Sequence, residues 1–215
     1  MDKLKIISMN AQGLRDKNKR KDVFNFLKNK NASIYFVQDT HFTDEEMKTI
    51  YIDFGFTCYF NNNDSRSRGV ATFISKNIDF NLSTEYADKG GNLLILDCRI
   101  DNKSLTLVNI YGPNKDTPDF YRHIKNKIQE FNNPCIMAGD FNLILNPSID
   151  CYDYLHLNNP KARDAVIDLM LDSNLNDCWR DLNMEKKEFT WFKKNTNKKK
   201  QIGFFPNFKQ FNDIC

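Results

Sequence analysis

The sequence has no apolar run long enough to span a bilayer, and its first ten residues, MDKLKIISMN, lack the apolar core of a secretory signal peptide. It also has no internal repeat and no linker rich in Pro, Gly or Ser. The 215 residues are 40% hydrophobic and 27% charged, which is typical of one globular domain with a sizeable core. We therefore expect an intracellular monomer, nuclear or cytoplasmic, that does not bind membranes.

Cysteine and histidine lack the spacing of metal sites and disulfide frameworks. The six cysteines are scattered without a Cys-x-x-Cys pair, and the three histidines do not complete a ligand set with them. We expect reduced structural thiols, and neither disulfides nor a zinc site.

Positive charge is concentrated late in the chain. Residues 185–200 hold seven Lys and two Glu, whereas the whole chain has a net charge of only +3. The remainder is therefore close to neutral. A basic segment of this kind suits a polyanionic partner, and a solvated Lys-rich tail explains it equally well.

Hydrophobic patterning predicts a mixed α+β domain with two antiparallel-rich sheets covered by helices. Apolar residues at helical spacing predict helices over residues 18–29, 43–51, 117–131 and 160–171, with a helix or turn over 175–182. Strand-like runs cover residues 3–9, 33–38, 54–60, 69–75, 77–86, 92–100, 104–111, 135–138 and 188–192. Residues 101–103 are expected to form a hairpin loop.

The segment Pro134–Asn142 places paired polar groups at the end of a buried strand. Its apolar part ends at Gly139, and Asp140 and Asn142 follow two residues apart, on the same side of an extended segment. A strand followed by a capped turn is the alternative, because Asp and Asn favour such turns. The carboxyl end of a buried strand is also where α/β sheets place active sites.

Polar residues end three further predicted strands, namely Asn10, Asp39 with His41, and Tyr111. If these strands lie side by side, their polar ends converge with Asp140 at one edge. Carboxylate and carboxamide oxygens suit Mg²⁺ better than zinc. A metal, a carboxylate base and phenol and amide donors together suit hydrolysis at phosphorus.

The motifs that carry these residues occur in an order known from one protein family. They are Ser8–Leu14, Val37–His41, Gly69–Phe73, Val108–Asn114, Gly139–Asn142 and Phe189–Trp191. Over about residues 4 to 192, the chain resembles the endonuclease/exonuclease/phosphatase superfamily, and most of all the apurinic-like endonuclease domain of non-LTR (LINE-type) retrotransposons. The superfamily also contains phosphatases and sphingomyelinases. The turn at residues 12–14 and the segment Tyr111–Asn114 favour the retrotransposon branch.

The resemblance implies a DNase I-like four-layer α/β sandwich, in which two facing mixed β-sheets are flanked by helices. It also implies hydrolysis of DNA phosphodiesters with Mg²⁺ or Mn²⁺ and without a small-molecule cofactor. By matching position, Asp39 would hold the metal with Asn10 nearby, and Asp140 would be the general base. Asn142 would orient Asp140 or the phosphate, and Tyr111 would contact the scissile phosphate or the leaving oxygen.

The family resemblance assigns roles to other residues less specifically. Arg163, Thr190 and Trp191 would contact DNA, although a surface position at a helix N-terminus is the better interpretation of Arg163. His41 is expected to be a structural companion of the metal ligand. The same resemblance predicts DNA as the partner.

Two departures from the family pattern predict weak or absent activity. Asp39 stands where the family has Glu, and the side chain that is one methylene shorter predicts weakened Mg²⁺ binding. The closing Arg-x-Asp and Ser-Asp-His motifs are also missing, so we expect residues 1–192 to form an incomplete domain without its last strands. Residues 193–215 would be a divergent tail that is Lys-rich and then Phe-rich, either docked or disordered. A non-catalytic nucleic-acid-binding or decaying remnant of the fold is the alternative.

Overall fold

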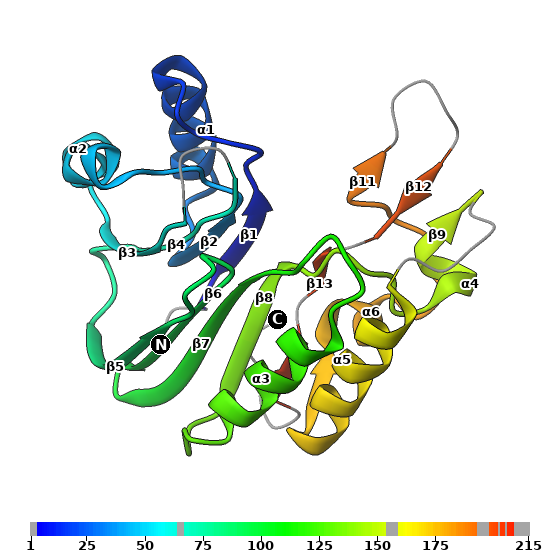
Figure 1. Ribbon diagram of the computed structural model, residues 1–215. Coiled ribbons are helices and arrows are strands. Elements are labelled where there is room, and N and C mark those ends of the chain that lie inside the picture. Colours follow the sequence, from blue (N-terminus) through cyan, green and yellow to red (C-terminus); the bar gives the residue numbers. More distant parts are fainter. Residues whose placement is uncertain are drawn as a thin grey trace.

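Two β-sheets pack face to face, and helices cover their outer sides (Figure 1). The computed structural model describes residues 4–63, 67–153, 159–192, 198–201, 203–204 and 206–208. Within these ranges, no helix has the length and apolar character needed to cross a membrane. The architecture confirms the predicted α+β fold of two mixed sheets flanked by helices.

The first sheet has four strands in the order β1-β2-β4-β3. β1 and β2 are parallel, and the other pairs are antiparallel. The strands are β1 (Ile6–Asn10), β2 (Ile34–Gln38), β3 (Thr57–Asn61) and β4 (Val70–Ile74), and the covering helices are α1 (Lys17–Lys30) and α2 (Asp44–Phe54). At the start of α2, the Thr43 amide donates to Glu46 Oε2 over 2.8 Å, as expected of a capping box.

The second sheet runs in the order β10-β14-β8-β7-β6-β5, and β13 also pairs with β8. β7 and β8 are parallel, whereas the other pairs are antiparallel. The strands are β5 (Phe80–Ala87), β6 (Leu93–Ile100), β7 (Lys103–Tyr111), β8 (Cys135–Asp140), β10 (Leu175–Asp177), β13 (Gly203–Phe204) and β14 (Pro206–Phe208). α3 (Pro118–Ile128) and α5 (Pro160–Asp172) cover its outer face.

A third, small sheet stands beside the sandwich, at the upper right of Figure 1. Its strands are β11 (Trp191–Phe192), β12 (Lys199–Lys200) and β9 (Cys151–Tyr152), in that order and all antiparallel. The short helices α4 (Pro147–Asp150) and α6 (Cys178–Leu182) complete the fold.

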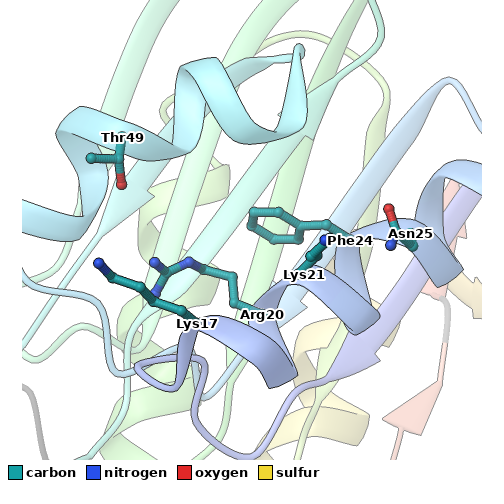
Figure 2. Close-up of a pocket in the computed structure, with 6 residues that line it drawn as sticks. All are labelled: Lys17, Arg20, Lys21, Phe24, Asn25 and Thr49. Carbon is teal, nitrogen blue, oxygen red and sulfur yellow. The ribbon is translucent and has the colours of Figure 1, made fainter.

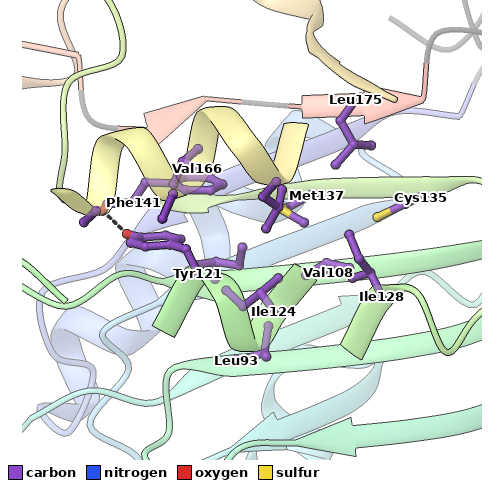
Figure 3. Close-up of a cluster of buried hydrophobic side chains, with 14 of the residues drawn as sticks. Leu93, Val108, Tyr121, Ile124, Ile128, Cys135, Met137, Phe141, Val166 and Leu175 are labelled. Carbon is purple, nitrogen blue, oxygen red and sulfur yellow. Dashed lines mark hydrogen bonds between the residues drawn. The ribbon is translucent and has the colours of Figure 1, made fainter. Parts of the chain in front are cut away.

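Three apolar layers hold the sandwich together. Phe36 and Ile74 of the first sheet meet Leu96 and Leu107 of the second between the sheets. On the outer face of the second sheet, Tyr121 and Ile124 of α3 pack with Val166 of α5 against Val108 and Met137 (Figure 3). A third cluster fixes α1 and α2 to the first sheet. Burial of this apolar surface is the main source of stability.

The structure differs from the sequence prediction at the end of α2. Phe54 was expected to begin a strand, but it is the last residue of α2, and its ring stacks on Phe56 with centroids 4.2 Å apart. Gly55 has φ 74°, the left-handed conformation with which many helices end. The expected hairpin loop is confirmed, because Asp101 and Asn102 both have positive φ and join paired residues Ile100 and Lys103.

The described part of residues 193–215 is paired with the body of the protein. Lys199–Lys200 joins β9 and β11, Gly203–Phe204 pairs with β8, and Pro206–Phe208 pairs with β10 and, at Asn207, with β8. We expected the domain to lack its last strands, but the edge of the second sheet beside β8 is occupied. Backbone N–H and C=O groups make this pairing, so it does not require the absent Arg-x-Asp motif. A domain boundary at residue 192 stays a prediction.

Candidate active site

Three predicted site residues occupy the last positions of their strands. Asn10 ends β1, Tyr111 ends β7 and Asp140 ends β8, and Tyr111 is paired with Asp140. Asp39 directly follows β2, where β2 lies parallel to β1. The fold therefore brings these side chains to one edge of the sandwich, as the positions of the strand ends predicted.

Asp140 is buried, with 6% of its surface exposed, and both of its carboxylate oxygens accept hydrogen bonds. Oδ2 accepts from Nδ2 of Asn10 over 2.8 Å, and Oδ1 accepts from the amide of Asn142 over 3.0 Å. Burial raises the pKa of Asp140 above its usual value, and these two hydrogen bonds and the charge of Lys200 oppose that rise. The result is an oriented carboxylate whose raised pKa suits a general base.

Asn142 does not lie on an extended segment with Asp140, so the reason given for their proximity was wrong. β8 ends at Asp140, and Asn142 has φ 52°, a left-handed conformation that Asn tolerates. Its backbone amide orients Asp140, while its side chain donates to the Gly112 carbonyl over 2.8 Å. Asn159 in turn donates to the Asn142 carbonyl over 2.9 Å. Asp140 and Asn142 therefore form a capped turn and are also the paired polar groups of the site, so the two interpretations are compatible.

Asp39 also has a left-handed backbone, with φ 55°, and polar groups contact its side chain. Its Oδ1 lies 2.9 Å from Nε2 of His41 and accepts from the Arg68 amide over 3.2 Å. His41 therefore contacts the predicted metal ligand, the position expected for a structural companion. These contacts hold the short Asp39 side chain in place.

Tyr111 connects the Asp39 and Asp140 halves of the site. Its hydroxyl hydrogen-bonds with the side chains of Asp39 and Asn114. Burial, followed by the negative charges of Asp39 and Asp140, raises the pKa of Tyr111 to about 12. The phenol therefore stays protonated at neutral pH and is a hydrogen-bond donor.

The oxygen donors at this edge fit a hard divalent cation. The oxygens that would hold it are those of the Asp39 carboxylate and Oδ1 of Asn10, which also accepts from the Gln12 amide over 2.9 Å. The described part of the chain contains no group of three or more His, Cys, Asp and Glu side chains placed to bind a metal. Mg²⁺ needs no such group, because it keeps several waters and binds through one or two carboxylates plus substrate phosphate.

A buried polar bridge beneath the site joins the two sheets and was missed by the sequence interpretation. Gln38 of β2 donates to Oδ1 of Asn109 over 2.8 Å, and Asn109 donates to the Ala71 carbonyl over 2.9 Å. Both side chains are almost fully buried. The available signal was a polar residue at the end of one largely apolar strand and near the end of another, since buried polar groups need partners.

Comparison with known proteins identifies the family. A sequence profile of the Endonuclease/Exonuclease/phosphatase family matches residues 7–174. This chain belongs to that family. A relative, the “Transposon TX1 uncharacterized 149 kDa protein” of Xenopus laevis, is 27% identical in an alignment of 196 positions that covers 87% of this chain. The chain spans 14% of the length of that transposon protein.

Solved structures of AP endonucleases share the fold. The AP endonuclease LMAP from Leishmania major has a TM-score of 0.79 at 16% identity, covering 96% of this chain and 79% of its own. The catalytic domain of Xenopus laevis APE2 has a TM-score of 0.75 at 20% identity, covering 96% of this chain and 82% of its own. An AP endonuclease from Archaeoglobus fulgidus scores 0.74 at 18% identity, with coverages of 95% and 86%. The DNase I-like fold is confirmed.

The predicted DNA contacts of this endonuclease/exonuclease/phosphatase family member are less well defined. Arg163 donates through Nε to the Leu145 carbonyl over 2.7 Å and lies 3.3 Å from Asp164, so its contacts brace a loop. Thr190 is exposed just before β11. Trp191 begins β11, and its side chain lies outside the described residues. Their DNA contacts stay predictions.

A basic groove between α1 and α2 is separate from the strand-end site (Figure 2). Lys17, Arg20, Lys21 and Phe24 line it, and none of the predicted site residues does. Arg20 is buried and donates to the Leu14 carbonyl over 2.9 Å, which fixes the turn that enters α1. Arg20 therefore has a structural role. Because the predicted site residues lie elsewhere, we do not assign the active site to this groove.

Proposed function

We propose that this chain is a Mg²⁺-dependent DNA endonuclease domain from a retrotransposon polyprotein and hydrolyses phosphodiester bonds. The observation that carries the proposal is the buried Asp140 carboxylate, which Asn10 and Asn142 orient beside Tyr111. The family supports nuclease-type chemistry, and the similarity of the chain to a transposon protein and to AP endonucleases favours DNA as substrate.

The geometry assigns a role to each residue of the site. Asp140 takes a proton from the attacking water, which makes the water oxygen nucleophilic toward phosphorus. Asn10 and the Asn142 amide hold that carboxylate in one orientation. Tyr111, which stays protonated, donates to a phosphate oxygen as negative charge develops in the transition state.

The Asp39 carboxylate and the Asn10 amide oxygen would hold Mg²⁺ at this edge. The ion supplies Lewis-acid stabilisation of charge on the phosphoryl oxygens when it is bound. His41 and the Arg68 amide fix the orientation of Asp39. Mn²⁺ suits the same oxygen ligands.

Nicking of supercoiled plasmid tests the proposed function. We expect relaxed circles to form with Mg²⁺ or Mn²⁺ and not with excess EDTA, because charge stabilisation at phosphorus requires the cation. The assay follows conversion of supercoiled to relaxed plasmid on agarose over a range of protein concentrations. Conversion that is equally fast in EDTA, or absent with every divalent ion, would contradict the proposal.

Asp39→Glu is expected to lower the Mg²⁺ concentration for half-maximal nicking by about tenfold, because the longer side chain reaches the ion with less distortion. Titration of Mg²⁺ in the plasmid assay measures this change. Asp39→Asn is the matched control, since it keeps the size of Asp but removes its charge, and should raise the requirement. An unchanged requirement in Asp39→Glu would mean that the short ligand does not limit metal binding.

Non-catalytic nucleic-acid binding is the second candidate function. The observation that favours it is the replacement of the family Glu by Asp39, together with the Lys-rich run 193–200. Such a protein would bind DNA with an affinity that falls steeply with salt. Salt-sensitive binding without nicking under any metal condition would support this function in place of the enzyme.

A further inference from the structure

Lys200 stands next to the site on β12, the central strand of the small sheet. Its backbone is paired with Cys151 on one side and Trp191 on the other. Three residues later, Gly203 pairs directly with Asp140. Lys200 is therefore only three residues from the residue that pairs with the proposed general base.

The electrostatics of Lys200 link it to Asp140. Lys200 is half-buried, and this burial lowers the pKa of its ammonium, while the charge of Asp140 raises it. Reciprocally, Lys200 lowers the pKa of Asp140. A partly desolvated ammonium and a buried carboxylate attract each other more strongly than the same groups in water.

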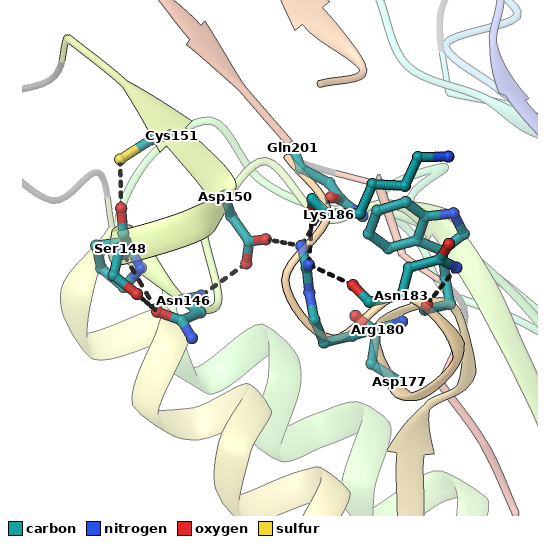
Figure 4. Close-up of polar contacts among 11 residues, drawn as sticks. Asn146, Ser148, Asp150, Cys151, Asp177, Arg180, Asn183, Lys186 and Gln201 are labelled. Carbon is teal, nitrogen blue, oxygen red and sulfur yellow. Dashed lines mark hydrogen bonds and ion pairs between the residues drawn. The ribbon is translucent and has the colours of Figure 1, made fainter. Parts of the chain in front are cut away.

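A buried network holds the segment that carries Lys200 (Figure 4). The Gln201 amide donates to the Asp150 carbonyl over 2.7 Å, and the Gln201 side chain accepts from Arg180 over 3.3 Å. Arg180 also pairs with the Asp150 carboxylate at 2.5 Å, and that carboxylate accepts from the Asn146 amide over 2.8 Å. Asp150 and Gln201 are 6% and 8% exposed. These contacts fix β12 and therefore hold the backbone of Lys200 in a defined position.

A phosphodiester that enters this edge meets two carboxylates, Asp39 and Asp140. Negative charge on the substrate therefore needs positive charge close to the general base, and the pairing of Gly203 with Asp140 places the segment that carries Lys200 beside that base. Lys binds phosphate as a compact point charge with three donors.

We propose that Lys200 binds the phosphate that is hydrolysed, and that the Asp150–Arg180–Gln201 network positions it. This inference rests on the proposed function, because it assumes that DNA phosphate reaches Asp140. Lys200 contacts a non-bridging oxygen, which lowers repulsion between the phosphate and the base and stabilises charge in the transition state.

A binding experiment in EDTA tests Lys200 separately from cleavage. The probes are two nicked DNA duplexes that differ only in a phosphate or a hydroxyl at the nick, because phosphodiester hydrolysis leaves a phosphate there. Fluorescence anisotropy measures Kd for each. For the wild-type chain, we expect the nick phosphate to tighten binding about tenfold, as a charge-assisted contact does.

Lys200→Met is expected to bind both duplexes equally, whereas Lys200→Arg retains most of the preference because it keeps the charge. Lys199→Met is the matched control, since Lys199 precedes Lys200 and points to the opposite face of the strand. It should weaken binding to both duplexes by the same factor, through the loss of one positive charge, and so preserve their ratio. Arg180→Met, which removes the support, should reduce the preference as well. Thermal unfolding confirms that each variant is folded.

The outcomes separate the inference from the proposed function. A phosphate preference that depends on Lys200 supports the inference even if the wild-type chain does not nick plasmid. Equal preferences in wild type and Lys200→Met, or no preference in the wild type, overturn it even if nicking is observed. Where nicking occurs, Lys200→Met should lower kcat by about a hundredfold, in line with the loss of one charge-stabilising donor.

Discussion

Asp140→Asn is expected to slow plasmid nicking by about a thousandfold or more, because the amide cannot take the proton of the attacking water. The substitution preserves size, and the remaining oxygen still accepts one of the hydrogen bonds made by Asn10 and the Asn142 amide. Binding of DNA in EDTA should change little. The measurement is the initial nicking rate at saturating Mg²⁺, with thermal unfolding as a check on folding.

The control for Asp140→Asn is Asp119→Asn, on the solvent-exposed first turn of α3. Asp119 pairs only at the surface with Arg122, and its side chain is 85% exposed. The control should nick at the wild-type rate. Asp140→Ala gives a second test without an isosteric side chain. Nicking by both Asp140 variants at rates near wild type would exclude Asp140 as the base.

Gly139→Ala is expected to destabilise the fold by at least about 3 kcal/mol. A Cβ atom on Gly139 would lie 1.9 Å from the carbonyl oxygen of Ile110 and 2.8 Å from its carbonyl carbon. Ile110 is the paired residue on β7, so backbone itself would have to move. The free energy of unfolding, measured by urea denaturation, should fall by this amount, or the variant should be insoluble.

Gly55→Ala is the matched control for this close approach. Gly55 has φ 74°, and an added Cβ would meet nothing within 4 Å. Its cost is therefore only that of a left-handed backbone, about 1 to 2 kcal/mol. If both variants lost the same free energy of unfolding, the contact between β7 and β8 would not be what requires glycine at residue 139.

The convergence of the side chains of the site was predictable because strand ends can be read from sequence. Apolar runs that stop at Asn10, Tyr111 and Asp140 identify where each strand leaves the sheet, and parallel pairing brings such ends together. The conformation after the strand was not predictable in the same way. Asn142 satisfies a period of two, but its left-handed backbone depends on contacts with Gly112 and Asn159, which are distant in sequence.

Residues that act through tertiary contacts were missed for a related reason. Gln38 ends its strand and Asn109 is one of several polar residues in its own, and only the packing of the two sheets shows that they bond to each other. Lys200 is one of seven Lys in residues 185–200, and nothing local distinguishes it from its neighbours. Its proximity to Asp140 depends on the pairing of Gly203 with β8, which is made by backbone groups.

The hydrogen bond between Asn10 and Asp140 joins residues of different sheets, because β1 belongs to the first and β8 to the second. Its 2.8 Å length therefore reports the alignment of two layers whose strands, within the described residues, do not pair with each other. A small sliding motion of one sheet over the other would break this bond while leaving every strand intact. Catalysis in such a molecule would be sensitive to the apolar layer between the sheets, where Phe36 meets Leu96, although these side chains are fully buried.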